Sequence, residues 1–106
     1  MSDAIQDILT ERGQRYGDFT GHAQITMALK GVITTALEER DKTLADDQRE
    51  ALDMICHKIG RIINGDPDYA DSWVDIAGYA QLVADRLQKP RHHPTWTEVK
   101  ADDAIS

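Results

Sequence analysis

The sequence predicts an all-α protein: an antiparallel helical bundle of three to four helices with an extended C-terminal tail. Apolar residues recur at the i, i+3/i+4, i+7 spacing of amphipathic helices in successive segments of the chain. No segment shows the sustained alternation of β-branched residues that is typical of a half-buried strand. Glycine and proline residues separate the helical segments, so we expect short connections between packed helices.

The first two helices flank a glycine-containing turn. We expect the first helix over about residues 3–12, where Gly13 ends it. The second begins at a cap residue, Asp18 or Thr20, and runs to about Arg40. Its apolar stripe consists of Ile25, Leu29, Val32, Ile33, Ala36 and Leu37.

The third and fourth helices form a predicted antiparallel hairpin. The third begins at a capping box with Asp47 in the cap position and ends at Asn64, with Gly65 in the left-handed conformation. A tight turn at Pro67 leads into the fourth helix, over about residues 69–88. The stripes expected to form their buried faces are Leu52, Ile55, Ile59 and Ile62 on the third, and Trp73, Ile76, Ala80, Val83 and Leu87 on the fourth.

Length and composition indicate one compact domain. The chain has 106 residues, of which 41% are hydrophobic and 29% are charged, as in soluble globular proteins. We assign residues 1–89 to a single helical domain and residues 90–106 to a C-terminal tail. Pro90 cannot continue the fourth helix, so we expect the tail to be mostly extended.

Three features favour a cytoplasmic location. No apolar run approaches the roughly 20 residues that a membrane span needs, so we expect no membrane partner. The N-terminus lacks the basic and apolar regions of a secretory signal. Cys56 is the single cysteine and cannot form an internal disulfide, which fits a reducing compartment.

The charge balance argues against binding to duplex DNA. The chain carries 12 basic and 19 acidic residues, for a net charge of −7 at pH 7. A protein that reads duplex DNA normally needs a basic surface to neutralise the phosphates. An acidic protein can still bind a polyphosphate when a divalent cation screens its carboxylates.

Carboxylates on the polar faces of the third and fourth helices predict a magnesium site. Glu50 and Asp53 lie one turn apart on the third helix, and Asp71 and Asp75 lie one turn apart on the fourth. Because Mg²⁺ takes oxygen ligands and retains several waters, these four carboxylates suffice to hold it. The alternative is that they are solvated and form weak i, i+4 pairs.

Basic and sulfur-containing side chains accompany these carboxylates. Lys58 and Arg61 would supply positive charge to a phosphoryl group. His57 could bind zinc with Asp53, but a zinc site usually draws ligands from several places. The other histidines, which lie on distant segments, are His22, His92 and His93. Cys56 borders the apolar stripe, so we expect a core residue and not a nucleophile.

A dense cluster of aromatic and charged residues occupies the turn between the first two helices. It reads Arg15-Tyr16-Gly17-Asp18-Phe19. Such a loop could stack on a base and contact its edge. The alternative is a turn whose aromatic side chains plug the end of the bundle.

Two stretches resemble a small family of phage and prophage helical proteins of unassigned function. They are residues 11–19, and residues 57–61 followed by 65–80. The run Asp-Ser-Trp-Val-Asp-Ile-Ala-Gly-Tyr-Ala at residues 71–80 is the specific part, and the match covers most of residues 11–83. The resemblance implies a phage origin and therefore a location in the host cytoplasm.

The predicted arrangement of helices and carboxylates is more distantly similar to the all-α nucleoside triphosphate pyrophosphohydrolases of the MazG and dimeric dUTPase type. Those enzymes carry Glu-Glu-x-x-Glu on one helix and Glu-x-x-Asp on a later one, and these carboxylates bind Mg²⁺. Residues 49–53 stand for the first motif, with Arg49 replacing the leading Glu and Asp53 the last. Residues 71–75 stand for the second, with one extra residue between the carboxylates. The resemblance implies a MazG-like fold and a homo-oligomer, either a dimer or a tetramer.

The leading hypothesis is a Mg²⁺-dependent pyrophosphohydrolase-like phage protein that releases pyrophosphate from a (deoxy)nucleotide. Its catalytic residues are Glu50, Asp53 and Asp75, which with Asp71 hold the metal and orient a water. Its substrate-binding residues are Lys58, Arg61, Tyr16, Arg15 and Trp73. The alternative is a non-catalytic oligomer that binds or sequesters a nucleotide or a nucleotide-derived signal, as an anti-defence protein would. A third hypothesis is a protein–protein interaction module.

Overall fold

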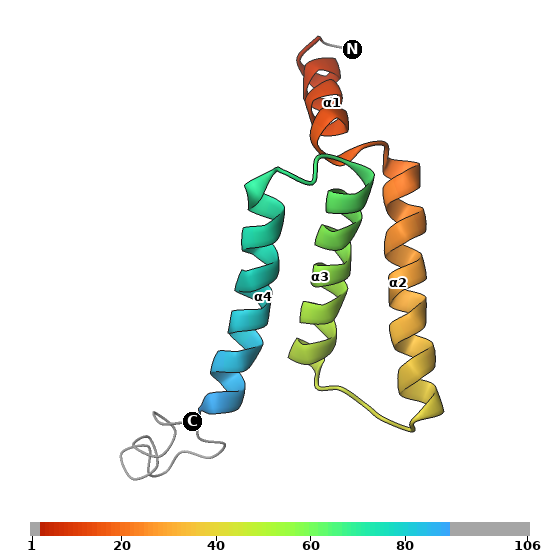
Figure 1. Cartoon of the computed structure of the whole chain (residues 1–106), viewed down its shortest axis with the longest axis vertical. Coiled ribbons are helices and arrows are strands. Elements are labelled where there is room, and N and C mark those ends of the chain that lie inside the picture. The colour runs from red at the N-terminus through yellow and green to blue at the C-terminus, as the bar shows by residue number, and fades with distance from the viewer. Residues whose placement is uncertain (1–2, 90–106) are drawn as a thin grey trace.

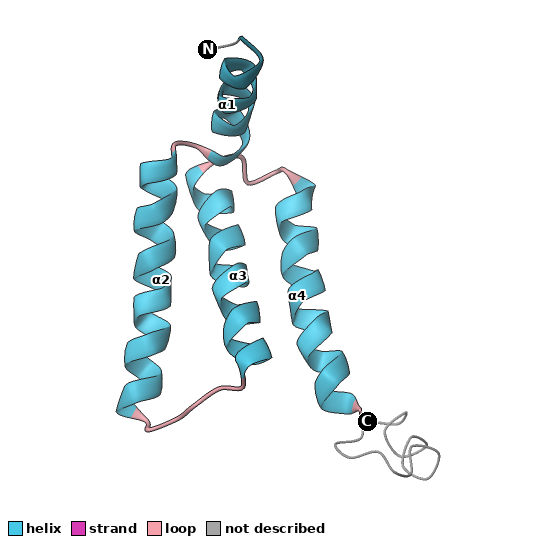
Figure 2. Ribbon diagram, turned by 180° about the vertical axis from the view of Figure 1, so that it is seen from behind, coloured by secondary structure: helices cyan, strands magenta, loops and turns pink. Residues whose placement is uncertain are grey.

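The computed structural model describes residues 3–89, and it confirms the all-α class. The helices are α1 (Asp3–Tyr16), α2 (Phe19–Glu39), α3 (Asp46–Asn64) and α4 (Ala70–Gln88). The last three lie side by side in one layer with α3 in the middle, and α1 lies beyond one end of this layer (Figure 1). Figure 2 shows the same layer from behind, with short connections at both ends. The predicted tail at residues 90–106 lies outside the described residues.

The first helix is longer than the sequence predicted. It continues through Gly13 to Tyr16, so the prediction that Gly13 ends the helix was wrong. Gly17 ends it instead, because its φ of 76° lies in the left-handed region that disfavours other residues. A side chain at Gly17 would also collide with the backbone carbonyl of Asn64. The turn between α1 and α2 is therefore shorter and tighter than the predicted loop.

The N-terminal caps agree with the sequence at α2 and differ at α3. Asp18 caps α2, since its side chain accepts a hydrogen bond of 3.2 Å from the backbone N–H three residues later. At α3 the cap position is Ala45, whose N–H donates to Oε1 of Gln48 at 2.9 Å. The predicted capping box at Asp47 was wrong, because this residue lies inside α3 and pairs with Arg86 of α4.

Gly65 ends α3 for a different reason from the predicted one. Its φ of −129° is not left-handed. A side chain at this position would collide with the backbone of Arg15 and Tyr16, so glycine allows the end of α3 to approach the end of α1. The backbone N–H of Asp66 then donates to the carbonyl of Arg15 at 2.6 Å.

The α3–α4 hairpin is antiparallel, as predicted, and two ion pairs mark its register. Lys58 Nζ lies 3.0 Å from Asp75 Oδ2, and Arg86 Nη2 lies 2.6 Å from Asp47 Oδ1. The number of residues between the two pairs is the same along α3 as along α4, so the two helices keep one register between them.

The layer encloses little core. Among the described residues, the buried hydrophobic side chains are Ala51 and Cys56, at 7% and 4% exposed, and no large side chain is fully buried. The prediction that Cys56 is a core residue is confirmed, and burial raises the pKa of its thiol. The predicted burial of the stripes was wrong at Leu52 of α3 and at Ala80, Trp73 and Leu87 of α4, which are exposed, Trp73 and Leu87 at 55% and 45%. A single layer of helices has nothing to cover that side.

None of the helices within residues 3–89 combines the length and the apolar character of a membrane span.

Candidate functional site

A cavity opens where the end of α1, the Gly17–Asp18 turn, the start of α2 and the C-terminal half of α3 meet. Its volume is about 440 Å³, within the range of sites that bind small molecules. We call it the α1–α3 cavity. Its polar and aromatic lining comes mainly from Arg12, Tyr16, Phe19, His22, His57 and Arg61.

Asn64 holds the turn that shapes this cavity. Its Nδ2 donates to the carbonyl of Tyr16 at 2.9 Å and to the carbonyl of Asp18 at 2.7 Å. The Tyr16 carbonyl lies at the end of α1, where the last carbonyls lack partners within the helix, and the Asp18 carbonyl also accepts from the N–H of His22 at 3.1 Å. The last residue of α3 thus fixes the turn between α1 and α2, a contact across 48 positions that the sequence did not reveal.

The aromatic residues of the turn divide between the two predicted roles. The Tyr16 ring packs edge-on against Tyr69 with centroids 6.1 Å apart, which closes this end of the bundle. The guanidinium carbon of Arg61 lies 4.3 Å from the centroid of the Tyr16 ring, in a cation–π contact. Phe19 is 80% exposed at the cavity. Two predicted substrate-binding residues, Tyr16 and Arg61, therefore line this cavity together.

Two histidines meet beside these residues. His22 Nε2 lies 3.2 Å from His57 Nδ1, and the ring planes cross at 82°. Burial lowers the pKa of His57 to about 4, with added contributions from His22 and Arg61. Burial also lowers the pKa of His22, ahead of the nearby positive charges. Both imidazoles are therefore neutral at pH 7, and one donates a hydrogen bond to the other.

The buried nitrogen of His22 indicates the direction of this hydrogen bond. Among the described residues, His22 Nδ1 is a buried atom without a partner, and it lies against Gly60 of α3. A buried N–H without a partner is rarer than a buried acceptor without one, so we assign the proton of His22 to Nε2. His57 then accepts at Nδ1 and carries a proton on Nε2 that it can donate to a ligand.

This pair was not predicted from the sequence. His22 lies 35 positions from His57 and was placed on a distant segment. Antiparallel packing of α2 on α3 brings them together, which no local spacing shows. Arg12 was not predicted as a site residue either, because the sequence placed it at the end of a shorter helix, whereas Phe19 belongs to the turn cluster that was expected either to stack on a base or to plug the end of the bundle. The remaining predicted histidines, His92 and His93, lie outside the described residues.

The carboxylates predicted to hold Mg²⁺ point to different partners. Asp53 Oδ1 accepts from Arg49 Nε at 3.0 Å, and Arg49 also donates to Thr34 of α2. Asp75 faces Lys58 of α3. In the observed register Lys58 is level with Asp75, so Asp53 lies about 7–8 Å further along the layer, at 1.5 Å per residue.

The other two carboxylates are equally separate. Asp71 accepts a hydrogen bond from the hydroxyl of Tyr69 at 3.0 Å, and Glu50 is exposed on α3. Within residues 3–89, no three His, Cys, Asp or Glu side chains come close enough to hold a metal ion. As placed in one chain, these carboxylates do not fit a Mg²⁺ ion shared by α3 and α4. Magnesium binding therefore stays a prediction.

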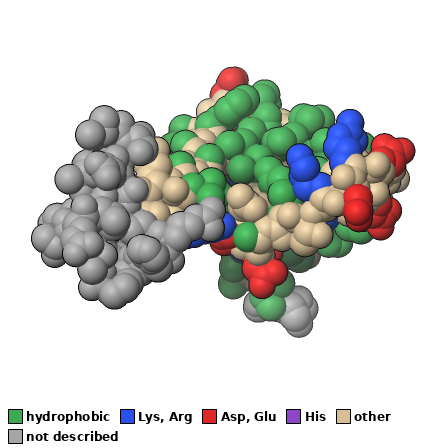
Figure 3. All heavy atoms as spheres, turned by 90° about the horizontal axis from the view of Figure 1, so that it is seen from below, with side chains coloured by type: hydrophobic (Ala, Val, Ile, Leu, Met, Phe, Trp, Pro, Cys, Tyr) green, Lys and Arg blue, Asp and Glu red, His purple; other side chains and the backbone are tan. Residues whose placement is uncertain are grey.

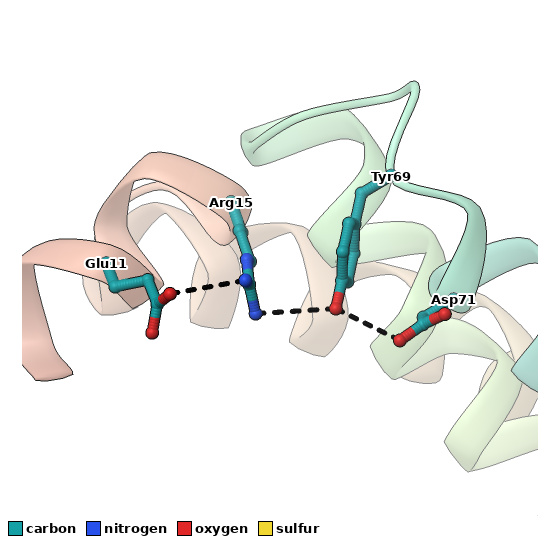
Figure 4. A network of polar contacts seen from close by, with 4 residues as sticks. All are labelled: Glu11, Arg15, Tyr69 and Asp71. Carbon is teal, nitrogen blue, oxygen red and sulfur yellow. Dashed lines mark hydrogen bonds and ion pairs between the residues drawn. The ribbon is translucent and has the colours of Figure 1, made fainter.

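Two predicted site residues belong to a polar network between α1 and α4. Figure 4 shows the chain of contacts from Glu11 through Arg15 and Tyr69 to Asp71. Arg15 Nη2 lies 3.2 Å from Glu11 Oε2, and its Nη1 lies 3.4 Å from the Tyr69 hydroxyl. The hydrogen bond that Tyr69 donates to Asp71 raises the pKa of the tyrosine. Arg15 and Asp71 thus tie α1 to α4, away from the α1–α3 cavity.

Lys58 and Trp73, the other two predicted substrate-binding residues, also lie outside the cavity. Lys58 is buried, at 8% exposed, and its ammonium pairs with Asp75. The indole N–H of Trp73 donates to the carbonyl of Pro67 at 2.8 Å, which fixes the turn before α4. Both residues have structural contacts that account for their positions.

Comparison with known proteins gives a family. A family described as a domain of unknown function, DUF6378, matches residues 1–87. No curated protein and no solved structure matches the chain. The matched region contains the whole α1–α3 cavity and the α3–α4 hairpin up to the last turn of α4.

Proposed function

The chain belongs to the DUF6378 family, a domain of unknown function, and we propose that it binds a nucleotide or a nucleotide-derived small molecule in the α1–α3 cavity. One observation carries this proposal. Two arginines, two aromatic rings and two neutral histidines converge on one cavity, against one acidic residue, Asp18, in a chain whose net charge is −7. Basic side chains gathered at a cavity of an acidic protein favour an anionic ligand there.

The arginines suit the phosphates of the ligand. Arg12 of α1 and Arg61 of α3 both line the cavity, and a guanidinium forms paired, charge-assisted hydrogen bonds to phosphate oxygens. Arg61 already rests on the Tyr16 ring, so less side-chain freedom is lost when it binds. Its position on the polar side of α3 keeps the guanidinium apart from the hydrophobic stripe.

Phe19 and His57 suit the base. The Phe19 ring is 80% exposed at the cavity and offers a flat face for stacking, worth about 1–3 kcal/mol per base. His57 Nε2–H can donate to an acceptor on the base or on a phosphate. A cavity of about 440 Å³ fits one nucleoside with its nearest phosphates better than a nucleic-acid strand.

Thermal-shift measurements with a panel of nucleotides in EDTA test this function. We expect a nucleotide to raise the Tm without added metal, and Arg61→Gln to remove most of that rise. Arg40→Gln is the matched control, because Arg40 is an exposed arginine at the far end of α2. Absence of a shift for every nucleotide, or equal loss in both variants, would contradict nucleotide binding in this cavity.

Hydrolysis is the second candidate function. We propose it because Glu50 and Arg61 share one side of α3, so carboxylates and the cavity lie on the same side of this helix. The resemblance to MazG-type pyrophosphohydrolases supports hydrolysis, and with it we propose a MazG-like fold. Release of pyrophosphate from (deoxy)nucleoside triphosphates with Mg²⁺ tests it. If a nucleotide binds in EDTA and no pyrophosphate appears with Mg²⁺, the protein is a binder and not this enzyme.

A further inference from the structure

The middle helix shows that the layer has two different sides. His57 and Gly60 of α3 face α2, whereas Lys58 and Asp47 face α4. At about 100° per residue, the hydrophobic residues of α3 project between these two directions on one side, and its polar residues on the other. The hydrophobic set consists of Leu52, Ile55, Ile59, Ile62 and Ile63. The polar set includes Glu50 and Arg61.

The stripes of the outer helices lie on the same side as the hydrophobic set of α3. Both α2 and α4 run antiparallel to α3. When their residues are placed at about 100° per position from the side chains that contact α3, their stripes point to that same side of the layer. These residues are Ile25, Leu29, Val32 and Ala36 on α2, and Trp73, Ile76, Ala80, Val83 and Leu87 on α4. Together with the hydrophobic set of α3 they form what we call the apolar face, which contains no Asp, Glu, Lys or Arg. Figure 3 shows hydrophobic side chains gathered along the upper side of the layer when it is seen from below.

The apolar face is not covered by the described part of the chain. Val32 is 67% exposed, Ile63 is 64% exposed and Trp73 is 55% exposed. Globular domains bury such faces by packing two layers of secondary structure against each other, and α2, α3 and α4 supply one layer. The missing partner is therefore a second layer of similar length.

We propose that a second copy of this chain covers the apolar face, so that two three-helix layers stack face to face. The helices of the layer have 21, 19 and 19 residues, so two copies match each other in length. Side chains on all three helices of the face are more than half exposed, such as Val32, Ile63 and Trp73, and a stable protein interface covers roughly 800 Å² of such surface per partner. A two-fold arrangement lets the same face serve on both chains.

The charge distribution also favours a second copy. Two chains with a net charge of −7 repel each other wherever acidic groups meet, and the hydrophobic stripes of the apolar face contain none, while Glu39 borders Val32 and Ala36 at the edge of the face. A membrane surface is a poorer occupant, since peripheral helices usually flank their apolar face with lysine and arginine to meet anionic lipids. The α1–α3 cavity, with Arg61 and His57, faces the other side of α3 and stays open in such a dimer.

The oligomeric state of the wild-type protein is the first test. Sedimentation velocity should give twice the chain mass of 11.9 kDa at micromolar concentration. The Tm should rise with protein concentration over a range of about 1 to 100 μM, because dilution favours dissociation of the dimer. A monomer at every concentration, with a constant Tm, overturns the proposal. Monomeric protein that binds phosphatidylcholine vesicles would overturn it in favour of a membrane.

A matched pair of variants on α2 tests which face is used. Val32 lies on the apolar face and Met27 on the opposite side of α2, and they are 67% and 64% exposed. We expect Val32→Glu to weaken dimerisation at least tenfold, because it places two carboxylates in the interface, while Met27→Glu changes it by less than threefold. A dimer that Met27→Glu disrupts and Val32→Glu does not would overturn the proposal. If Val32→Glu does not fold, the concentration dependence of the wild-type Tm decides the outcome.

Discussion

Gly60 lets α3 approach the polar side chains of α2. A Cβ atom at this position would lie 2.6 Å from Thr26 Oγ1 and 3.0 Å from His22 Nδ1, and both neighbours are buried. Neither neighbour has room to move aside without disturbing the contact between the helices. The absence of a side chain at one residue therefore allows the pair of histidines to form.

The first prediction concerns this contact. Gly60→Ala should lower the free energy of unfolding by about 1–3 kcal/mol, because the added methyl group overpacks the α2–α3 contact. Gly78→Ala is the control: nothing lies within 4 Å of its Cβ position, so better helix propensity should raise stability by up to about 1 kcal/mol. Urea unfolding measures both. Equal effects of the two substitutions would contradict the close approach at Gly60.

The second prediction concerns the pH dependence of stability. Burial lowers the pKa of His57 to about 4 and also lowers that of His22, whereas an unfolded histidine titrates near 6.5. The unfolded chain therefore binds these protons first as the pH falls. The stability is fully present above pH 6.5 and declines between about pH 6.5 and 4, by on the order of 2 kcal/mol.

Urea midpoints at a series of pH values between these limits measure this decline. His57→Asn should flatten it, because a neutral amide replaces the group whose pKa is most strongly shifted. A wild-type profile that is flat from pH 7 to pH 5 would show that the histidines are not buried together.

At the scale of helices, Lys58 and Asp75 hold the α3–α4 hairpin in register. The Lys58 side chain is 10% exposed and depends on Asp75, 3.0 Å away, to balance its charge. The sequence predicted that Asp75 helps to hold a metal ion. Its position opposite a buried ammonium indicates a structural contribution as well.

The third prediction follows from this ion pair. Asp75→Ala should destabilise the protein by about 1–2 kcal/mol, because it leaves the Lys58 ammonium buried without its partner. Asp85→Ala, on an exposed part of the same helix, should change stability by less than about 0.5 kcal/mol. Lys58→Met added to Asp75→Ala should restore most of the loss, since no unpaired charge remains. Thermal or urea unfolding of the wild type and the three variants checks this, and a double variant no more stable than Asp75→Ala would contradict it.

Local sequence signals predicted the helices well and their ends less well. The hydrophobic periodicity gave four helices, the hairpin turn at Pro67 and the cap at Asp18, since each depends on neighbouring residues. The end of α1 differed because Gly17 and Gly65 are selected by contacts between α1 and α3. Such contacts join segments far apart in the chain, so no local pattern reports them.

The rotation of the helices was the main feature that the sequence left hidden. A stripe of hydrophobic residues predicts one buried face, and the stripes of α3 and α4 were expected to be buried. In the layer, Asp75 and Arg86 approach α3, while Trp73 and Leu87 are largely exposed. The amphipathic pattern states which face is apolar, but not whether the same chain or a second one covers it.

At the scale of the whole molecule, the two sides of the layer have different roles. One side carries the apolar face that we propose a second copy covers. The other carries His57 and Arg61 beside the α1–α3 cavity. Tyr16, Phe19 and Arg61 could be proposed as ligand contacts from the sequence, whereas Arg12 and His22 join them only through the packing of three helices.

Chemical-shift mapping of the ¹⁵N-labelled protein during titration with a nucleotide tests the binding site most directly. We predict shifts concentrated at the residues that line the α1–α3 cavity, namely Arg12, Tyr16, Phe19, His22, His57 and Arg61. The amides of the α4 carboxylates Asp71 and Asp75 should move little. Shifts centred on those carboxylates, or none with any nucleotide, would contradict nucleotide binding in this cavity.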